Sequence, residues 1–136
     1  DEKKKILISA KHNAYENKFN YQHQRIIKID KINSNLFGED KLLAVNKNKN
    51  LLNMYSIRFH LYPGINAVQT MGKNSILIQI EKNKSLIFVT SGGNLDLEKS
   101  IFLGRNQIVN NFCITISGTL NTNENKIITW ELKRNN

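Results

Sequence analysis

The sequence predicts an all-β fold, an antiparallel β-sandwich of about eight to ten short strands. Apolar residues alternate with polar ones along short segments, which is the side-chain period of a half-buried strand. Clusters of Asn, Gly, Lys and Asp separate these segments and are typical of turns. No long segment shows the 3.6-residue period of an amphipathic helix. A barrel is the alternative architecture for the same pattern.

The candidate strands follow one another at short intervals along the chain. They are expected at residues 6–10, 23–30, 36–45, 54–62, 66–70, 75–81, 85–91, 95–103, 112–120 and 126–134. Turns are expected at "KINSN" (31–35), at "KNK" (82–84), where a tight hairpin is predicted, and at "NTNEN" (121–125). The "GG" pair that precedes residue 94 also reads as a turn, because the spacing and the helix of a phosphate-binding loop are missing.

The segment "IRFHLYPG" (57–64) shows the alternation most clearly and poses a question about its polar face. Ile57, Phe59 and Leu61 are predicted to face the core. Their expected core partners are Ile78, Phe88, Ile114 and Trp130. Arg58, His60 and Tyr62 are predicted to line the outer face of the sheet as structural and not catalytic residues. In the last strand, Ile128, Trp130 and Leu132 should likewise share the buried face.

Length and composition indicate one domain that spans residues 1–136. No apolar run approaches the roughly 20 residues that a membrane-spanning helix needs, so no membrane partner is expected. The chain begins "DEKKKILISA", without an initiator Met or a signal-peptide pattern, and we expect it to be part of a longer protein.

The net charge of +9 is compatible with a polyanionic partner. The basic residues are mostly Lys and fall mostly in turns, where they also protect strand ends from aggregation. Both interpretations of the charge remain open. Nucleic acid ranks behind acidic polysaccharide as a partner, because the Lys residues do not form one stripe.

Few residues carry the spacing of a known catalytic or metal site. His12, His23 and His60 are far apart in sequence, and the short spacing of a local metal clamp is missing. Cys113 lies in a predicted strand, where burial should raise its pKa and suppress its reactivity. Glu39 and Asp40 follow a glycine and read either as a carboxylate pair or, as we favour, as a polar turn. We therefore assign no metal-binding and no catalytic residue.

Aromatic rings alternate with cations in "HNAYENKFNYQHQR" (12–25), and this is the candidate binding site. Rings can lie against a sugar face, and cations can hold a carboxylate or a sulfate. His12, Tyr15, His23 and Arg25 are the candidate substrate-binding residues. The same mixture would suit single-stranded nucleic acid, and a loop that folds its aromatic residues into the core is the structural alternative.

Four segments in order resemble the C-terminal β-sheet region of the heparinase II/III-like polysaccharide lyases. An H-x-x-Y element and an H-x-R strand occur in residues 10–30, and a G-x-D element occurs in "LFGEDKL" (36–42). An R-F-H-L-x-P strand begins at Arg58, and a W-x-L-x-R element closes the chain from Trp130. The resemblance extends from about Ala10 to Arg134, nearly the whole chain.

The resemblance implies an enzyme in which an N-terminal helical toroid packs against a C-terminal β-sandwich, with the substrate between them. It also implies β-elimination on acidic polysaccharides, in which a base takes the proton from C5 of a uronic acid. That reaction needs a Tyr or His within reach of the proton and groups that stabilise the developing enolate. A cell-envelope or periplasmic location and a structural metal are further implications of the resemblance.

The chain departs from the family pattern at the catalytic and metal-binding segments. The family's catalytic bases and metal ligands lie on the toroid and in a His-rich segment that precedes the elements matched here. The expected function is therefore the C-terminal β-sandwich portion of such a lyase, which supports the substrate cleft but is inactive alone and holds no cofactor. The alternative is a non-catalytic binding module for acidic glycans.

Overall fold

The computed structural model describes residues 4–49, 52–121 and 123–135. It contains two antiparallel sheets, one of seven strands and one of three, and the one helix in these residues has a single turn. The prediction of an all-β sandwich with about ten strands is confirmed.

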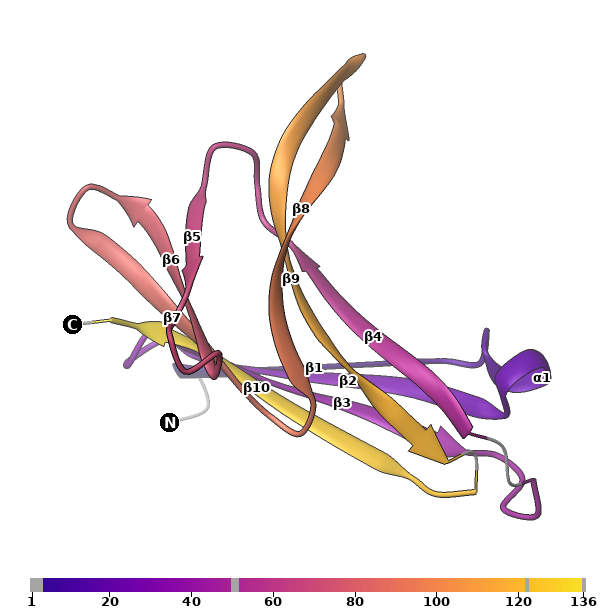
Figure 1. Ribbon diagram of the computed structural model, residues 1–136. Coiled ribbons are helices and arrows are strands. Elements are labelled where there is room, and N and C mark those ends of the chain that lie inside the picture. Colours follow the sequence, from indigo (N-terminus) through magenta and orange to yellow (C-terminus); the bar gives the residue numbers. More distant parts are fainter. Residues whose placement is uncertain (1–3, 50–51, 122, 136) are drawn as a thin grey trace.

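The strands lie close to the positions that the sequence predicts. In chain order the elements are β1 (Lys5–His12), α1 (Glu16–Phe19), β2 (Tyr21–Asp30), β3 (Asn35–Ala44), β4 (Leu52–His60), β5 (Asn66–Gln69), β6 (Ser75–Glu81), β7 (Lys84–Ser91), β8 (Asn94–Gly104), β9 (Gln107–Asn121) and β10 (Lys126–Arg134). β8 and β9 are longer than predicted, because they continue as a two-stranded arm that projects from the sandwich (Figure 1). No helix among the described residues is long and apolar enough to cross a membrane.

The larger sheet has the strand order β1-β2-β3-β10-β7-β6-β5, and the smaller sheet has the order β4-β9-β8. The smaller sheet crosses over the larger one, and the core lies between them (Figure 1). Buried aliphatic and aromatic residues of the core alternate along the strands, as a sheet with one buried face requires. They are Ile76, Ile78, Phe88, Ile128 and Trp130 in the larger sheet, and Ile57, Leu95, Ile114, Ile116 and Leu120 in the smaller.

The prediction for the two faces of "IRFHLYPG" is confirmed. Ile57 is buried, and Phe59 and Leu61 pack against the core cluster. Arg58, His60 and Tyr62 are exposed on the opposite face. All four expected core partners of this segment belong to the same core cluster. The polar residues of β4 therefore lie on the outer face of the smaller sheet.

The prediction of a polar turn at Glu39 and Asp40 is wrong. Both residues lie in the middle of β3, which runs without interruption between β2 and β10. Asp40 faces the core, while Glu39 points to the other face and forms an ion pair with Lys41 at 3.1 Å. The two carboxylates lie on opposite faces of the sheet, so they do not form a pair either.

The aromatic segment between β1 and β2 is divided between the core and the surface. Tyr21 is buried and donates hydrogen bonds from its hydroxyl to the backbone carbonyls of Asn121 and Glu124. Tyr15 and Phe19 remain 46% and 40% exposed beside α1. Some aromatic rings of this segment are therefore exposed, as a binding surface requires, and others are folded into the core.

Candidate functional site

The carboxylate of Asp40 is the centre of a buried polar cluster in the larger sheet. Its side chain is fully buried. Oδ1 accepts hydrogen bonds from Nε2 of His23 at 2.6 Å and from Nε of Arg25 at 2.8 Å. Oδ2 accepts a hydrogen bond from the indole N–H of Trp130 at 2.9 Å. A buried charge needs such partners, because an unpaired carboxylate in the interior is strongly unfavourable.

Strand register explains why these side chains meet. Arg25 on β2 lies directly opposite Asp40 on β3, and His23 is two residues away on the same face. Trp130 on β10 lies opposite Gly38, so its ring covers the position that a side chain there would occupy. A Cβ atom on Gly38 would come within 2.0 Å of the ring of Trp130. Gly38 is thus required for Trp130 to reach the carboxylate.

The pKa of Asp40 is set by opposing effects. Burial by itself would raise the pKa of this carboxyl group. The hydrogen bonds from His23, Arg25 and Trp130 and the positive charge of Arg25 lower it, and together they outweigh burial. The pKa of Asp40 is therefore below its usual value, and Asp40 is an anion at neutral pH.

The hydrogen-bond chain continues from Asp40 through His23 to His12. Nδ1 of His23 lies 3.1 Å from Nε2 of His12, which is opposite it on β1. The carboxylate can only accept, so Nε2 of His23 carries a proton and Nδ1 of neutral His23 is an acceptor. Nε2 of His12 must then be the donor. The remaining nitrogen, Nδ1 of His12, accepts a long hydrogen bond from the backbone N–H of Ala14 at 3.4 Å.

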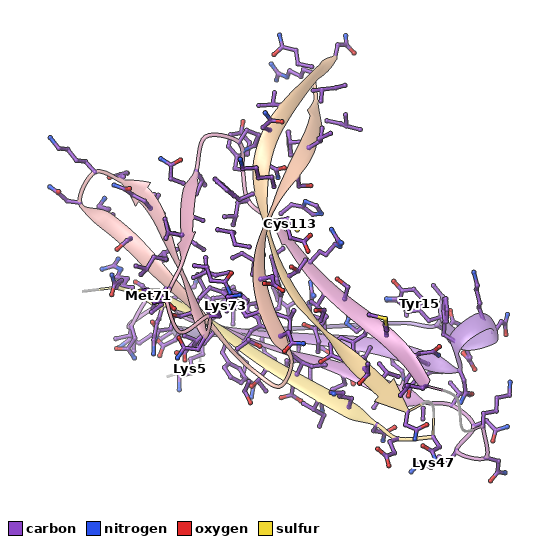
Figure 2. The ribbon with its side chains drawn as sticks, viewed as in Figure 1. Lys5, Tyr15, Lys47, Met71, Lys73 and Cys113 are labelled. Carbon is purple, nitrogen blue, oxygen red and sulfur yellow. The ribbon has the colours of Figure 1, made fainter. Side chains whose placement is uncertain are left out.

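A pocket of about 300 Å³ opens beside this cluster, between the inner face of β2 and β4. His23 and Arg25 line one side, and the aromatic rings of Tyr15 and Phe19 line the end near α1. Figure 2 shows Tyr15 next to this helix. The remaining lining residues are Tyr21, Leu42, Leu120 and residues 53–58 of β4. The pocket combines aromatic surface with a few polar groups, as small-molecule sites commonly do.

The structure brings the four predicted substrate-binding residues to one end of the molecule. His12 contacts both Tyr15 and His23, with ring centroids 5.1 Å apart in each pair. His23 and Arg25 also donate hydrogen bonds to Asp40, a contact that was not predicted from the sequence. Sequence reasoning missed Asp40 as the residue that organises the site. The alternation of side chains along the strand could have identified it, because Asp40 falls on the same face as Leu36, Gly38 and Leu42.

The other residues considered from the sequence lie elsewhere. His60 is exposed on the outer face of β4. Cys113 is fully buried on β9, and burial raises the pKa of its thiol. Among the residues that the structure describes, no group of three His, Cys, Asp or Glu side chains could hold a metal ion.

The sequence elements that carry the family resemblance converge on this one cluster. The H-x-R strand supplies His23 and Arg25, and the G-x-D element supplies Gly38 and Asp40. The closing element supplies the ring of Trp130. The R-F-H-L strand supplies Phe59, whose ring centroid lies 4.8 Å from that of Trp130 and whose ring packs under the guanidinium of Arg25. Each element is weak alone, but all of them contribute to one set of contacts.

Fold and site together define an all-β sandwich domain with a buried carboxylate beside an aromatic-lined pocket. A family model described as "Heparinase II/III-like, C-terminal" matches residues 1–131. The chain belongs to this family.

Solved structures agree with the fold of this family. The heparan sulfate lyase HepC from Pedobacter heparinus superposes with a TM-score of 0.78 and 11% identity, over 96% of this chain and 20% of that one. A heparinase III superposes with a TM-score of 0.76 and 14% identity, over 96% of this chain and 19% of the other. The chain thus spans about one fifth of these structures. The comparison with curated protein sequences gives no match.

Proposed function

We propose that this chain is the C-terminal β-sandwich portion of a polysaccharide lyase that cleaves uronic-acid-containing polysaccharides by β-elimination. In this proposal the domain supports the substrate cleft and does not catalyse alone. The observation that carries it is the family membership, together with the convergence of the family's sequence elements on the Asp40 cluster.

The hydrogen bonds of the candidate residues support the proposal that the isolated domain is inactive. β-Elimination needs a base with a free lone pair near the substrate and a group that neutralises the uronate carboxylate. Nε2 of His23 and Nε of Arg25 are already bonded to Asp40. Burial also raises the pKa of Tyr21 and of Tyr55, both of which line the pocket, and so opposes formation of a phenolate base.

Exposed apolar side chains support packing against a further part of the lyase. Leu7 on β1 is 65% exposed, and Leu52 and Met54 on β4 are 76% and 83% exposed. Covering such side chains is favourable, because it removes apolar surface from water. We propose the N-terminal helical toroid as the covering partner. A structural metal would be held by residues of that larger protein, whose location would be the cell envelope or periplasm.

Incubation with heparin, heparan sulfate and alginate tests the inactivity of the domain. The unsaturated uronate that β-elimination forms is followed by its ultraviolet absorbance. We expect no increase in absorbance with the 136-residue chain. Robust cleavage by this chain would contradict the proposal that the catalytic groups lie elsewhere.

The second candidate function is a non-catalytic binding module for acidic glycans. The pocket favours it, because the rings of Tyr15 and Phe19 and the guanidinium of Arg25 line the same pocket. Chromatography on immobilised heparin and on a neutral glucan separates the two functions. Salt-sensitive retention on heparin alone supports a binding module, and the absence of retention supports a purely structural role.

That experiment must distinguish retention caused by the pocket from retention caused by lysines scattered over the surface. Lys5 and Lys73 lie toward one end of the molecule and Lys47 toward the other (Figure 2). A matched pair of variants makes the distinction, with Tyr15→Ala altering the pocket and Tyr62→Ala altering an exposed ring outside its lining. If the pocket holds the glycan, only Tyr15→Ala should reduce retention. Equal retention of both variants would assign binding to the scattered lysines.

A further inference from the structure

Asp40 and its hydrogen-bonded neighbours carry no net charge when both imidazoles are neutral. This cluster consists of Asp40, Arg25, His23 and His12. The carboxylate of Asp40 offsets the guanidinium of Arg25 at 2.8 Å. His12 and His23 contribute hydrogen bonds but no charge in this state. An acidic saccharide that entered the pocket would therefore meet a salt bridge that is already formed. One more positive charge in this cluster would strengthen the electrostatic attraction of an acidic saccharide.

One added proton supplies that charge. Histidine is the side chain whose charge ordinarily changes between pH 5 and 8. The proton binds Nδ1 of His12, where it takes the place of the long 3.4 Å hydrogen bond from the backbone N–H of Ala14. The N–H bond at Nε2 of His12 then breaks as its proton passes over 3.1 Å to Nδ1 of His23. The result is neutral His12 and an imidazolium at His23, hydrogen-bonded to the buried carboxylate at 2.6 Å.

The surroundings of His23 favour this location for the positive charge. The Asp40 carboxylate compensates for the loss of water around a half-buried imidazolium, whose side chain is 19% exposed. Arg25 opposes it as a like charge, but Arg25 is itself paired with Asp40. Tyr21 is a further titratable group on the same strand. Tyr15, Glu16 and Lys18 lie near α1, Tyr55 and Arg58 lie on β4, and Lys126 on β10 lies over the ring of Tyr55. Arg58 is paired with Glu98, and Glu16 accepts a hydrogen bond from Gln22.

We propose that the pocket binds the carboxylate or sulfate group of an acidic saccharide together with one proton, which His12 receives and His23 retains. This inference rests on the proposed contact with acidic polysaccharide and adds the control of that contact by pH. The guanidinium nitrogens of Arg25 other than Nε donate hydrogen bonds to the anion, and the positive charge of His23, whose two N–H groups are bonded to Asp40 and His12, attracts it electrostatically. The rings of Tyr15 and Phe19 lie at the end of the pocket, where they can contact the sugar.

Calorimetric titration with a heparin-derived tetrasaccharide between pH 5.5 and 8 tests the coupling. If binding takes up one proton, the dissociation constant should rise by roughly tenfold per pH unit at pH values where both histidines of the cluster are neutral. His23→Gln keeps an N–H donor for Asp40 but is not protonated, so it should bind weakly and without this pH dependence. His60→Gln alters an exposed histidine outside the pocket lining and is the matched control, which should behave as the unchanged protein does.

Nitrogen NMR spectra of the imidazoles test the same inference without a ligand. At pH 8, His12 and His23 should both carry their proton on Nε2, as the geometry of the hydrogen bonds requires. A proton on Nδ1 of His23 at pH 8 would overturn the proton transfer. Binding with the same affinity at every pH would overturn the coupling but leave the glycan contact intact. No binding at any pH would overturn both this inference and the glycan contact.

Discussion

The chain contains two sets that each combine an arginine, a histidine and a carboxylate, and they have opposite physical character. The inner set is His23, Arg25 and Asp40 on β2 and β3. The outer set is Arg58, His60 and Glu98 on β4 and β8. Arg25 and Asp40 approach to 2.8 Å with the carboxylate fully buried, whereas Arg58 and Glu98 lie 3.5 Å apart and are each about half exposed.

The difference shows that the position of a charged group determines its contribution to stability more than its residue type does. Strand alternation places the outer set in water, where an ion pair is screened and contributes little to stability. The inner set lies under the smaller sheet, where an unpaired charge is costly and each donor is needed. The inner set also lies beside the pocket. We therefore expect substitutions in the inner set to have large effects and those in the outer set to have small ones.

Removal of the buried carboxylate should have the largest effect. Asp40→Ala leaves Arg25 and the indole N–H of Trp130 without their acceptor, and the free energy of unfolding should fall by about 3 to 5 kcal/mol. Denaturant unfolding followed by the fluorescence of Trp130 measures this change. Glu98→Ala is the matched control and should change the free energy of unfolding by less than about 1 kcal/mol. Similar losses in the two variants would remove the distinction between the sets.

Truncation of the ring between the two sheets should have the next largest effect. Phe59 packs against Trp130 and Phe88, with ring centroids 4.8 Å and 5.2 Å away. Phe59→Ala should reduce the free energy of unfolding by about 3 kcal/mol, because it leaves a cavity beside the cluster. His60→Ala, one residue along the same strand, should change it by less than about 0.5 kcal/mol. A loss for His60→Ala that equals the loss for Phe59→Ala would contradict the assignment of the two faces.

Acid should destabilise the protein through the inner set. The pKa of Asp40 is lower in the folded protein than its usual value near 4, so the stabilisation it provides is present above about pH 4. It is lost as the pH falls through the lower, folded pKa. Thermal unfolding between pH 2 and pH 6 should show a steeper decline for the unchanged protein than for Asp40→Asn. Parallel curves would indicate that Asp40 does not contribute to acid sensitivity.

Salt should have the smallest effect and should act on the outer set. The pair of Arg58 and Glu98 is exposed, so the change in free energy caused by Glu98→Gln, at most about 1 kcal/mol, should disappear in about 1 M salt. The change caused by Asp40→Asn should persist at that salt concentration. Chemical unfolding at two salt concentrations measures both. A salt-insensitive effect of Glu98→Gln would mean that the outer pair is better shielded than its exposure indicates.

The fold could be predicted because its signals are local. Alternation and turn composition gave β6 and β10 with the bounds found in the structure. The prediction began β9 five residues late, at residue 112, since Gln107 to Asn111 alternate poorly between apolar and polar residues. Asn20 illustrates a further limit. Its left-handed conformation ends α1 after one turn, and its side chain bonds the backbone at Asn46, a long-range contact.

The candidate site could be predicted only in part because its organisation is not local. His12, Tyr15, His23 and Arg25 were recognised by their chemistry in one continuous segment. The role of Asp40 depends on Trp130, which is far away in sequence and adjacent only through the pairing of β3 with β10. Gly38 favoured a turn because glycine commonly marks one. Here glycine is present because the ring of Trp130 occupies the space of a side chain.

If the domain contacts acidic glycan, the contact should be made by the inner set and its pocket and not by the scattered lysines. Backbone NMR spectra recorded during titration with a heparin-derived tetrasaccharide at pH 6 test it most directly. The largest chemical-shift changes should fall on His12, Tyr15, His23 and Arg25, while His60 and the turn lysines at Lys82 and Lys84 should change little. Changes that are largest at those lysines, with the pocket residues unaffected, would contradict it.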